Sequence, residues 1–395
     1  NSISDLLTYF VELGYNILKG KGVFKFIISN KFTRANYGEN LRLFLSQKTQ
    51  LSHFIDFSGV SVFDEATVDA AILGFIKQIN TNSDLEYANI RKNEFEYNKF
   101  EYYLSTIKQV LNQKLLTESS WSFEKEDVIN IKNKVELQGI PLKEWNIKIN
   151  YGIKTGYNEA FIIKKKKKNR LISEDQRSEN FIKPLLRGKD IQKYYPVYKD
   201  LWLIYIPKGF TIKSKLKKDD YYVEEPMPRY GFLEYDEAWE WFKSQLPAIA
   251  NHLILFKKQA EKRTDMGDFW WELRACAYLE DFDKPKIIYK DIAQQLTFLV
   301  DNDHFYTNNT NYFILGDVNL EYLVAIRNSS LIDYYYRLIS TQLGENAVRL
   351  FTQFVELIPV VLYSNIDLQQ KIVLLANQII EIKKQSMIND TTSLE

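Results

Sequence analysis

The chain has 395 residues, of which 45% are hydrophobic and 26% charged, a composition typical of a folded protein of about two to three domains. The formal net charge of +1 neither indicates nor excludes a basic stripe for nucleic acid. One cysteine, Cys276, excludes an internal disulfide, and one cysteine with three histidines argues against a structural zinc site.

No apolar run reaches the length of about 18 residues that crosses a bilayer, and no signal peptide is visible. The chain begins with Asn1, which suggests a piece of a longer protein. Together with the lone cysteine, these features predict a cytoplasmic protein without a membrane partner.

Residues 1–80 predict helices alternating with strands, which indicates an α/β layer. Leu6, Phe10, Leu13 and Ile17 have helical spacing and predict a helix over 6–17, and residues 37–48 predict a second, amphipathic helix with Leu41, Phe44 and Leu45 inward. Apolar runs predict strands over 23–28, 51–57 and 67–76. Residues 81–120 are polar and are expected to connect two domains, with one helix near 102–114.

From Trp121 onward the pattern predicts a mixed α+β domain. The predicted elements are a helix over 124–136, strands over 145–149, 160–164, 201–206, 286–289 and 312–315, and long helices near 236–263 and 320–339. Asp367–Lys384 predicts an amphipathic helix with Leu368, Ile372, Leu375, Ile379 and Ile382 on one stripe. That stripe suits a coiled-coil-like contact, but docking on the chain's own core is the favoured interpretation.

Several short motifs follow one another in the second half of the chain. Gly152 and Gly156 precede an apolar strand, and Arg187-Gly-Lys-Asp-Ile191 forms a basic turn. Trp270-Trp-Glu-Leu-Arg274 and Lys284-Pro-Lys-Ile-Ile-Tyr-Lys-Asp-Ile-Ala293 come later. No single motif is specific, but in this order they resemble the TaqI-like target-recognition domain. That domain is the DNA-reading module of adenine-specific DNA methyltransferases and is common in Type IIG restriction-modification enzymes.

The N-terminal part resembles the segments that come after the catalytic motif in the same family. The matching segments are 20–32, 37–42, 55–63 and 66–72. The resemblance therefore implies an α/β remnant, the second half of a Rossmann-like methyltransferase domain (1–80), then a connector (81–120). An α+β TaqI-like target-recognition domain (121–362) and a C-terminal amphipathic helix (363–395) complete the expected organisation.

Two motifs of the family do not occur in this sequence. The family binds S-adenosylmethionine with a glycine-containing loop and positions the target adenine with Asn/Asp-Pro-Pro-Tyr/Phe, and Pro226-Met-Pro228 lacks that pattern. We therefore expect this chain to be non-catalytic by itself. A missing N-terminal catalytic half would hold S-adenosylmethionine, and Mg²⁺ would be needed only if the parent protein carries a nuclease domain. Phe63 matches a family segment that stacks on the flipped adenine; alternatively it is a core residue.

Basic and polar residues of the motifs are the candidates for contacts with DNA phosphates, because such contacts fix register rather than sequence. They are Lys154, Thr155 and Tyr157 beside the glycines, Lys165 and Lys167 in the run Lys164–Lys168, Arg187, Lys189 and Lys193 in the basic turn, and Arg274. The alternatives are a structural turn for the glycines, a solvated hairpin tip for the lysine run, and an intramolecular role for the basic turn.

Base edges are read by polar side chains that reach into a groove. The candidates are Arg274, Gln294, Gln295, Asn308, Asn309 and Asn311, and the sequence does not rank them. No motif surrounds His53, His252 or His304, which we expect to be structural or surface residues.

The sequence thus predicts specific recognition of double-stranded DNA within an S-adenosylmethionine-dependent, adenine-specific methyltransferase, first of all a Type IIG enzyme. Three alternatives stay open. The parent could be the methyltransferase of another phage-defence system, or the chain could be a stand-alone, non-catalytic specificity module. A carbohydrate- or protein-binding domain is the third, because aromatic residues make up 15% of the chain.

Overall fold

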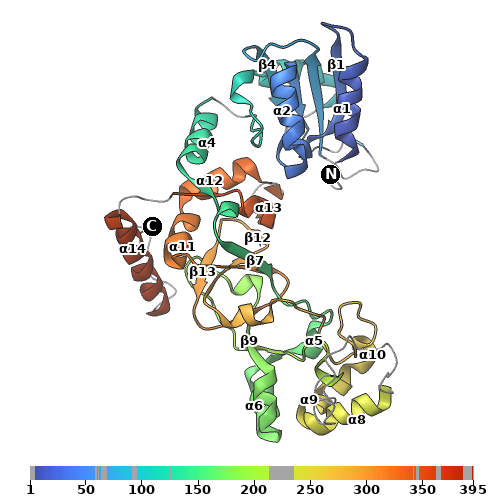
Figure 1. Cartoon of the computed structure of the whole chain (residues 1–395), viewed down its shortest axis with the longest axis vertical. Coiled ribbons are helices and arrows are strands. Elements are labelled where there is room, and N and C mark those ends of the chain that lie inside the picture. Colours follow the sequence, from blue (N-terminus) through green and yellow to red (C-terminus); the bar gives the residue numbers. More distant parts are fainter. Residues whose placement is uncertain are drawn as a thin grey trace, which may run out of the picture. The chain divides into compact units, whose positions relative to one another are not determined.

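The computed structural model describes residues 5–57, 60, 62–63, 69–90, 96–123, 126–212, 235–340, 342–343, 347–361, 366–385 and 394. They form two compact units, shown in Figure 1. Unit 1 comprises Asn1–Glu144 and Ser330–Leu362, and unit 2 comprises Trp145–Ser329 and Tyr363–Glu395. Both units mix helices with strands, as the sequence predicts.

A five-stranded sheet organises unit 1. Its order is β1 (Val23–Ser29), β3 (Ala70–Ile76), β2 (Gln50–Asp56), β4 (Asp84–Asn89) and β5 (Gln109–Asn112). Strands β2 and β4 pair in parallel, whereas β1–β3, β3–β2 and β4–β5 are antiparallel. The sheet is therefore mixed, and three of the strands lie where apolar runs predict them.

Helices cover both faces of this sheet. Helices α1 (Leu6–Ile17) and α2 (Glu39–Lys48) contribute Val11, Leu41 and Leu45 to a core with Phe54 and Phe75 (Figure 1). On the other face, α3 (Phe100–Ile107) packs over a smaller cluster centred on β2 and β4. Unit 1 therefore contains a three-layered α/β body.

The expected connector over 81–120 is wrong as a description of local structure, because β4 and β5 are strands of the sheet. Leu85, Tyr87 and Leu111 are at most 3% exposed, while Glu86 points outward and pairs with Lys108. Apolar and polar side chains alternate here with the period of two residues that is typical of a half-buried strand. The alternation is easily missed because the segment as a whole is rich in polar residues. The helix expected near 102–114 ends at Ile107, because Lys108 has an extended backbone.

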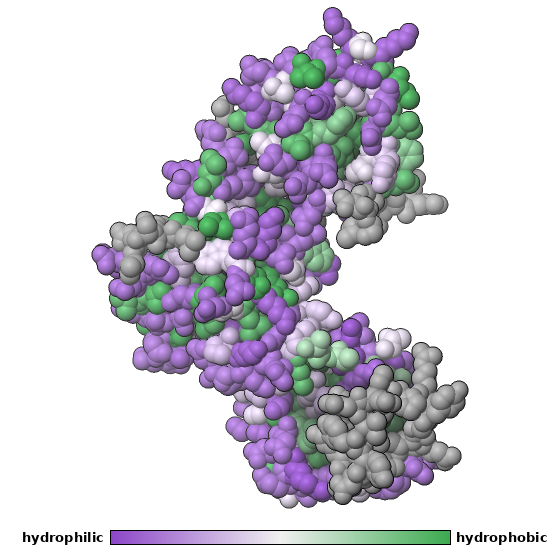
Figure 2. Space-filling view, viewed as in Figure 1, coloured by the Kyte–Doolittle hydropathy of each residue, from purple (hydrophilic) through white to green (hydrophobic). Residues whose placement is uncertain are grey.

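The apolar stripe of α1 faces away from the core of unit 1. Leu6, Phe10, Leu13 and Ile17 are 66%, 50%, 55% and 75% exposed, and Val11 faces the core instead. Edge strand β1 adds exposed apolar side chains beside this face, and Figure 2 shows hydrophobic groups on the surface of unit 1. The spacing predicts the helix correctly, but it does not determine what covers the apolar stripe.

Unit 1 also contains the residues just before unit 2 in the sequence, up to Glu144, and those that follow its first part, from Ser330 to Leu362. They form α4 (Glu126–Gln138), α12 (Ser330–Ile339), α13 (Thr352–Val355) and the antiparallel pairs β6 (Ile140–Pro141) with β18 (Pro359–Val360) and β16 (Gln342–Leu343) with β17 (Ala347–Arg349). Arg34 donates to the carbonyl of Ser340 at 2.9 Å, and Trp121 and Phe123 enter the core of the sheet. The boundary expected at residue 121 thus falls inside unit 1.

Unit 2 is built on two four-stranded sheets with a shared core. The first has the order β14 (Tyr306–Thr307), β9 (Ile182–Leu186), β10 (Leu201–Ile204), β8 (Ile162–Lys164), and the second β13 (Phe298–Asp301), β11 (Lys286–Lys290), β15 (Asn311–Gly316), β7 (Ile147–Tyr151). The strand expected over 160–164 is shorter, because α5 (Asn158–Phe161) precedes it.

Both long helices expected in this region are interrupted. Residues 236–263 form α8 (Tyr235–Gln245), α9 (Pro247–Leu253) and α10 (Lys257–Ala260), because Pro247 cannot continue α8 and begins α9. Residues 320–339 form α11 (Leu320–Asn328) and α12, separated by the extended backbone of Ser329.

Helix α14 (Ile366–Gln385) packs against α11 within unit 2, which agrees with docking on the chain's own fold. Its buried residues are Ala376 and Ile379, whereas Leu368 and Leu375 of the expected stripe are 37% and 40% exposed. Across the described ranges, none of the helices is both long enough and apolar enough to span a membrane.

Candidate nucleic-acid interface

Five segments of unit 2 that are distant in sequence meet at one edge of the first sheet. Thr307 pairs with Leu186, Pro184 with Trp202, and Leu201 with Lys164, and Ile153 forms a bridge with Asn308 outside β14. When these pairings are continued past the last paired residues, residues 154, 309, 187–189, 199–200 and 165 come to the same edge of the sheet. At this edge β8, β9 and β14 end and β10 begins. Neighbouring strands lie about 5 Å apart, so the edge extends over about 20 Å.

Several exposed lysines lie at this edge, and we call four of them, one from each of four segments, the lysine edge: Lys154, Lys165, Lys189 and Lys199. Two contacts confirm that the segments meet. Lys165 Nζ lies 3.6 Å from Asp200 Oδ2, and the Gly188 amide donates to Thr310 Oγ1 at 3.1 Å. Since one DNA strand carries a phosphate about every 3.4 Å along the helix axis, the edge matches about six steps of a strand.

The lysine run lies at the start of a helix, α6 (Lys165–Glu174). The alternative that the run forms a solvated hairpin tip is therefore wrong. No acidic residue stands in the first turn of α6, and its N-cap Lys164 makes no side-chain hydrogen bond there. Positive side chains at the positive end of a helix dipole are unfavourable, by about 0.3–1 kcal/mol each. The Lys168 ammonium group lies over the Trp202 ring, with Nζ 3.5 Å from the ring centroid, and makes a cation–π contact. A bound anion would offset the repulsion between the other lysines and the positive end of the helix dipole.

Arg187 has an intramolecular role, contrary to the expected phosphate contact. Its Nε and Nη2 donate to the two carboxylate oxygens of Asp190 at 2.9 and 3.0 Å, and Asp190 is 2% exposed. This bidentate pair closes the turn that presents Lys189 to solvent. Lys193, after the turn, is partly buried, and so is Lys167 on α6.

The two glycines shape a turn rather than a phosphate cradle. A Cβ on Gly152 would lie 2.1 Å from the Asn308 carbonyl oxygen, so glycine permits close approach of two backbone segments. Gly156 has φ +69°, which favours glycine. Thr155 is buried and donates from Oγ1 to Asn158 Oδ1 at 2.6 Å, and Tyr157 packs on Phe256. Of the three residues expected to contact DNA here, the turn exposes Lys154.

Replacing Gly152 by alanine is therefore expected to destabilise the chain by about 1–3 kcal/mol, because the new methyl group forces the backbone of Asn308 away. Gly20→Ala is a matched control, since a Cβ there meets no atom within 4 Å. Urea unfolding of both variants measures the difference. Equal stability of the two variants would show that the close approach at Gly152 does not exist.

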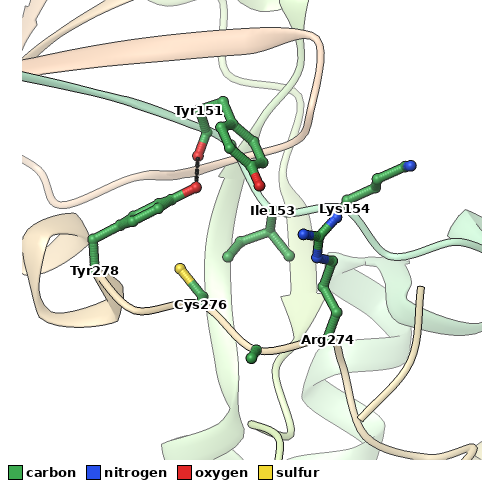
Figure 3. Close-up of a pocket in the computed structure, with 8 residues that line it drawn as sticks. Tyr151, Ile153, Lys154, Arg274, Cys276 and Tyr278 are labelled. Carbon is green, nitrogen blue, oxygen red and sulfur yellow. Dashed lines mark hydrogen bonds between the residues drawn. The ribbon is translucent and has the colours of Figure 1, made fainter. Parts of the chain in front are cut away.

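Asp265 joins two cations at the end of the lysine edge. Lys154 Nζ lies 2.8 Å from Asp265 Oδ2, and Arg274 Nη1 lies 3.2 Å from Oδ1. The hydrogen bond from Lys154, with the positive charge of Arg274, holds the pKa of Asp265 below its ordinary value although burial opposes this. Arg274, which is 42% exposed, lines a small hollow with Tyr151, Ile153, Lys154, Cys276 and Tyr278 (Figure 3).

The structure separates the candidate base-reading residues. Asn308 and Asn311 are 7% and 0% exposed; Asn308 accepts from Thr310 and Asn311 donates to the Leu186 carbonyl, so both hold the loop. Gln294 and Gln295, which follow β12 (Ile292–Ala293), are exposed, as is Asn309. Arg274 differs from these residues because a carboxylate anchors it beside the hollow.

The sequence patterns assign no role to several residues that shape this region. Lys199 stands outside every motif, and Asp265 is one acidic residue among many. Arg263 is buried and donates to the carbonyls of Thr155, Trp270 and Glu272. Glu272, within the Trp-Trp-Glu-Leu-Arg motif, accepts from the amides of Gly209, Thr211 and Asp268 at 2.9–3.0 Å, which explains the acidic residue in that motif.

The Phe63 side chain, in unit 1, is 46% exposed. The alternative interpretation of Phe63 as a core residue is therefore wrong.

His252 is buried and its Nε2 lies 3.0 Å from the Ala160 carbonyl oxygen, and burial lowers its pKa. His53 pairs with Glu86 at 3.2 Å, and His304 is exposed. Within the described part of the chain, no group of three or more His, Cys, Asp or Glu side chains is arranged to hold a metal ion.

Comparison with known proteins shows that the chain is similar to restriction-modification methyltransferases. Residues 183–360 match the TaqI-like C-terminal specificity domain, and residues 1–63 match the Eco57I restriction-modification methylase. Type II methyltransferase M.BstVI of Geobacillus stearothermophilus is 21% identical over 369 residues, covering 89% of this chain and 60% of that protein. Type II restriction enzyme and methyltransferase RM.Eco57I of Escherichia coli is 25% identical over 362 residues, covering 84% and 34%.

Among solved structures, the Type IIL restriction-modification enzyme MmeI in complex with DNA aligns with a TM-score of 0.50 at 13% identity. The alignment covers 98% of this chain and 45% of that one, and it shows a shared fold. The chain thus spans less than two thirds of the length of each of these three proteins. The resemblance to restriction-modification methyltransferases with a TaqI-like specificity domain is confirmed.

Proposed function

We propose that this chain recognises a DNA sequence for an S-adenosylmethionine-dependent, adenine-specific methyltransferase, first of all a Type IIG restriction-modification enzyme. The lysine edge is the observation that carries the proposal. It gathers four exposed cations from separate segments, and Lys189 and Lys199 lie inside the segment that matches the specificity domain. Lys154 and Lys165 come to the same edge through strand pairing.

The lysine edge suits a DNA backbone better than a small anion. Its cations are spread over about 20 Å instead of converging on one point. Lysine ammonium groups contact phosphates as point charges and fix the register of the protein on the duplex. The start of α6 adds the positive end of its dipole at Lys165. These contacts supply affinity, and sequence must be read by other side chains nearby.

The proposed target-recognition domain, residues 121–362, includes parts of both units, and residues 1–80 are proposed as the second half of a Rossmann-like methyltransferase domain. The sequence holds neither the glycine-containing cofactor loop nor the Asn/Asp-Pro-Pro-Tyr/Phe motif. We therefore assign no residue of this chain to S-adenosylmethionine and place its site, and the methyl transfer it supports, in another part of a longer parent protein. We place that protein in the cytoplasm.

Phe63 is proposed to stack on the target adenine after it leaves the duplex. An aromatic ring offsets part of the unstacking cost, and stacking contributes about 1–3 kcal/mol per base. The exposure of the Phe63 side chain agrees with this role, because a ring that receives a base must be reachable.

Binding of the 395-residue chain to a random-sequence duplex tests the proposal. Fluorescence anisotropy in 50 mM salt is expected to give a Kd of about 1–100 μM or tighter, the range of non-specific protein–DNA binding. An acidic polysaccharide of matched charge is the control for a general cation exchanger and is expected to bind more weakly. Absence of duplex binding in 50 mM salt would contradict the proposed function.

A further inference from the structure

We infer that Arg274 reads a guanine base at the hollow beside the lysine edge and that Asp265 positions its guanidinium group for this contact. The inference rests on the proposed function and adds to it the residue that confers specificity and the base it selects. It is carried by the arrangement of Arg274, Asp265 and Lys154 and by the walls of the hollow.

Two segments form the hollow. The end of β7 and the following turn contribute Tyr151, Gly152, Ile153 and Lys154, and the second segment contributes Arg274, Ala275, Cys276 and Tyr278 (Figure 3). The Tyr278 hydroxyl donates to the Tyr151 carbonyl at 3.1 Å and joins the two walls. The Tyr151 side chain is 41% exposed, and its ring meets that of Tyr278 edge to face at 5.9 Å. The two segments are thus held together where they place Lys154 and Arg274 beside each other.

The Arg274 guanidinium group lines this hollow with more N–H donors than its pair with Asp265 uses. A guanidinium group has five N–H donors. Among the described residues its side chain pairs with Asp265, through Nη1 at 3.2 Å. The other oxygen of Asp265 accepts from Lys154 at 2.8 Å, so the carboxylate is held from two sides. By contrast, Arg187 uses Nε and Nη2 on Asp190, and Arg263 uses its donors on backbone carbonyls.

The chemistry of the guanidinium group selects the base. Arginine carries donors and no acceptor, and guanine presents two adjacent acceptors, O6 and N7, in the major groove. Adenine presents one acceptor and one donor there, which an arginine cannot match. Because Lys154 belongs to the lysine edge, a phosphate at Lys154 would bring a nearby base edge within reach of Arg274.

Selection from a random-sequence duplex library tests this assignment. The whole chain is compared with R274A and R274Q, and with R177A as the matched control. Arg177 is also an exposed arginine of unit 2 paired with an aspartate, Asp175, at 2.8 Å. We expect the wild-type chain to enrich a motif that contains a guanine. R274A should lose the preference for that guanine by about tenfold to a hundredfold and keep the rest of the motif.

R274Q should shift the preference at the same position toward adenine, because a glutamine amide pairs with N6 and N7 of adenine. R177A should select the wild-type motif, and thermal melting should be unchanged in all variants. A uniform loss of affinity across all positions in R274A would overturn the inference, because that marks a phosphate contact. An unchanged motif in R274A would also overturn it. If the wild-type chain binds no duplex, the proposed function itself fails, and the wild-type selection shows this independently of the variants.

Discussion

Replacing Lys154, Lys165, Lys189 and Lys199 together by alanine is expected to weaken binding to duplex DNA about a thousandfold in 100 mM salt. If each lysine–phosphate contact contributes about 1 kcal/mol, four contacts contribute about 4 kcal/mol, which is about three orders of magnitude in Kd. All four side chains are exposed, so the variant should fold as the wild type does. Fluorescence anisotropy with a labelled duplex measures the change.

The matched control removes the same charge from other parts of unit 2. Lys208, Lys243, Lys257 and Lys384 are exposed and pair with acidic side chains on the surface. Their joint replacement by alanine should change the Kd less than about tenfold, because surface ion pairs contribute little and these residues lie off the edge. Equal losses in the two variants would mean that total charge, and not the lysine edge, determines affinity.

Replacing Lys286 by methionine is expected to lower the free energy of unfolding by about 3–5 kcal/mol. Lys286 Nζ lies 2.6 Å from Asp301 Oδ2, and the two side chains are 0% and 1% exposed. Burial lowers the pKa of Lys286 and raises that of Asp301, while their attraction opposes both shifts. Without the lysine, Asp301 is a buried carboxylate that has lost its counter-charge, although it still accepts from the amides of Asp303 and Phe305.

Urea unfolding followed by tryptophan fluorescence measures this loss, since six tryptophans at 145, 202, 239, 241, 270 and 271 lie in unit 2. Lys148→Met is the matched control, because Lys148 is 57% exposed and pairs with Asp281 at 2.7 Å. The control should change stability by less than about 1 kcal/mol. A Lys286→Met loss of the same small size would contradict the burial of the pair.

Local periodicity accounts for much of the fold that the sequence predicts. The apolar runs at 23–28 and 51–57 become β1 and β2, and the helix over 6–17 has its predicted bounds. Burial depends on partners distant in sequence, which explains why the stripe from Leu6 to Ile17 is exposed. Residues 81–120 are mostly polar and still supply strands β4 and β5, since a half-buried strand needs only every second side chain to be apolar.

The candidate site shows the same division between local and long-range information. Basic motifs identify Lys154, Lys165 and Lys189, but pairing across the sheet decides that they share an edge with Lys199. Residue type alone could not show that Arg187 is held by Asp190. Nor could it show that Asn308 and Asn311 are buried, because their partners include the backbone of β9.

The salt dependence of DNA binding tests the central claim, that the lysine edge contacts the phosphates of a duplex. Each neutralised phosphate contributes about −0.9 to the slope of log K against log salt concentration. We expect a slope of about −4 or steeper for the wild-type chain between 50 and 300 mM salt, and a slope less steep by about 3–4 for the variant without the four lysines. A wild-type slope near zero, or the same slope in both proteins, would contradict this claim.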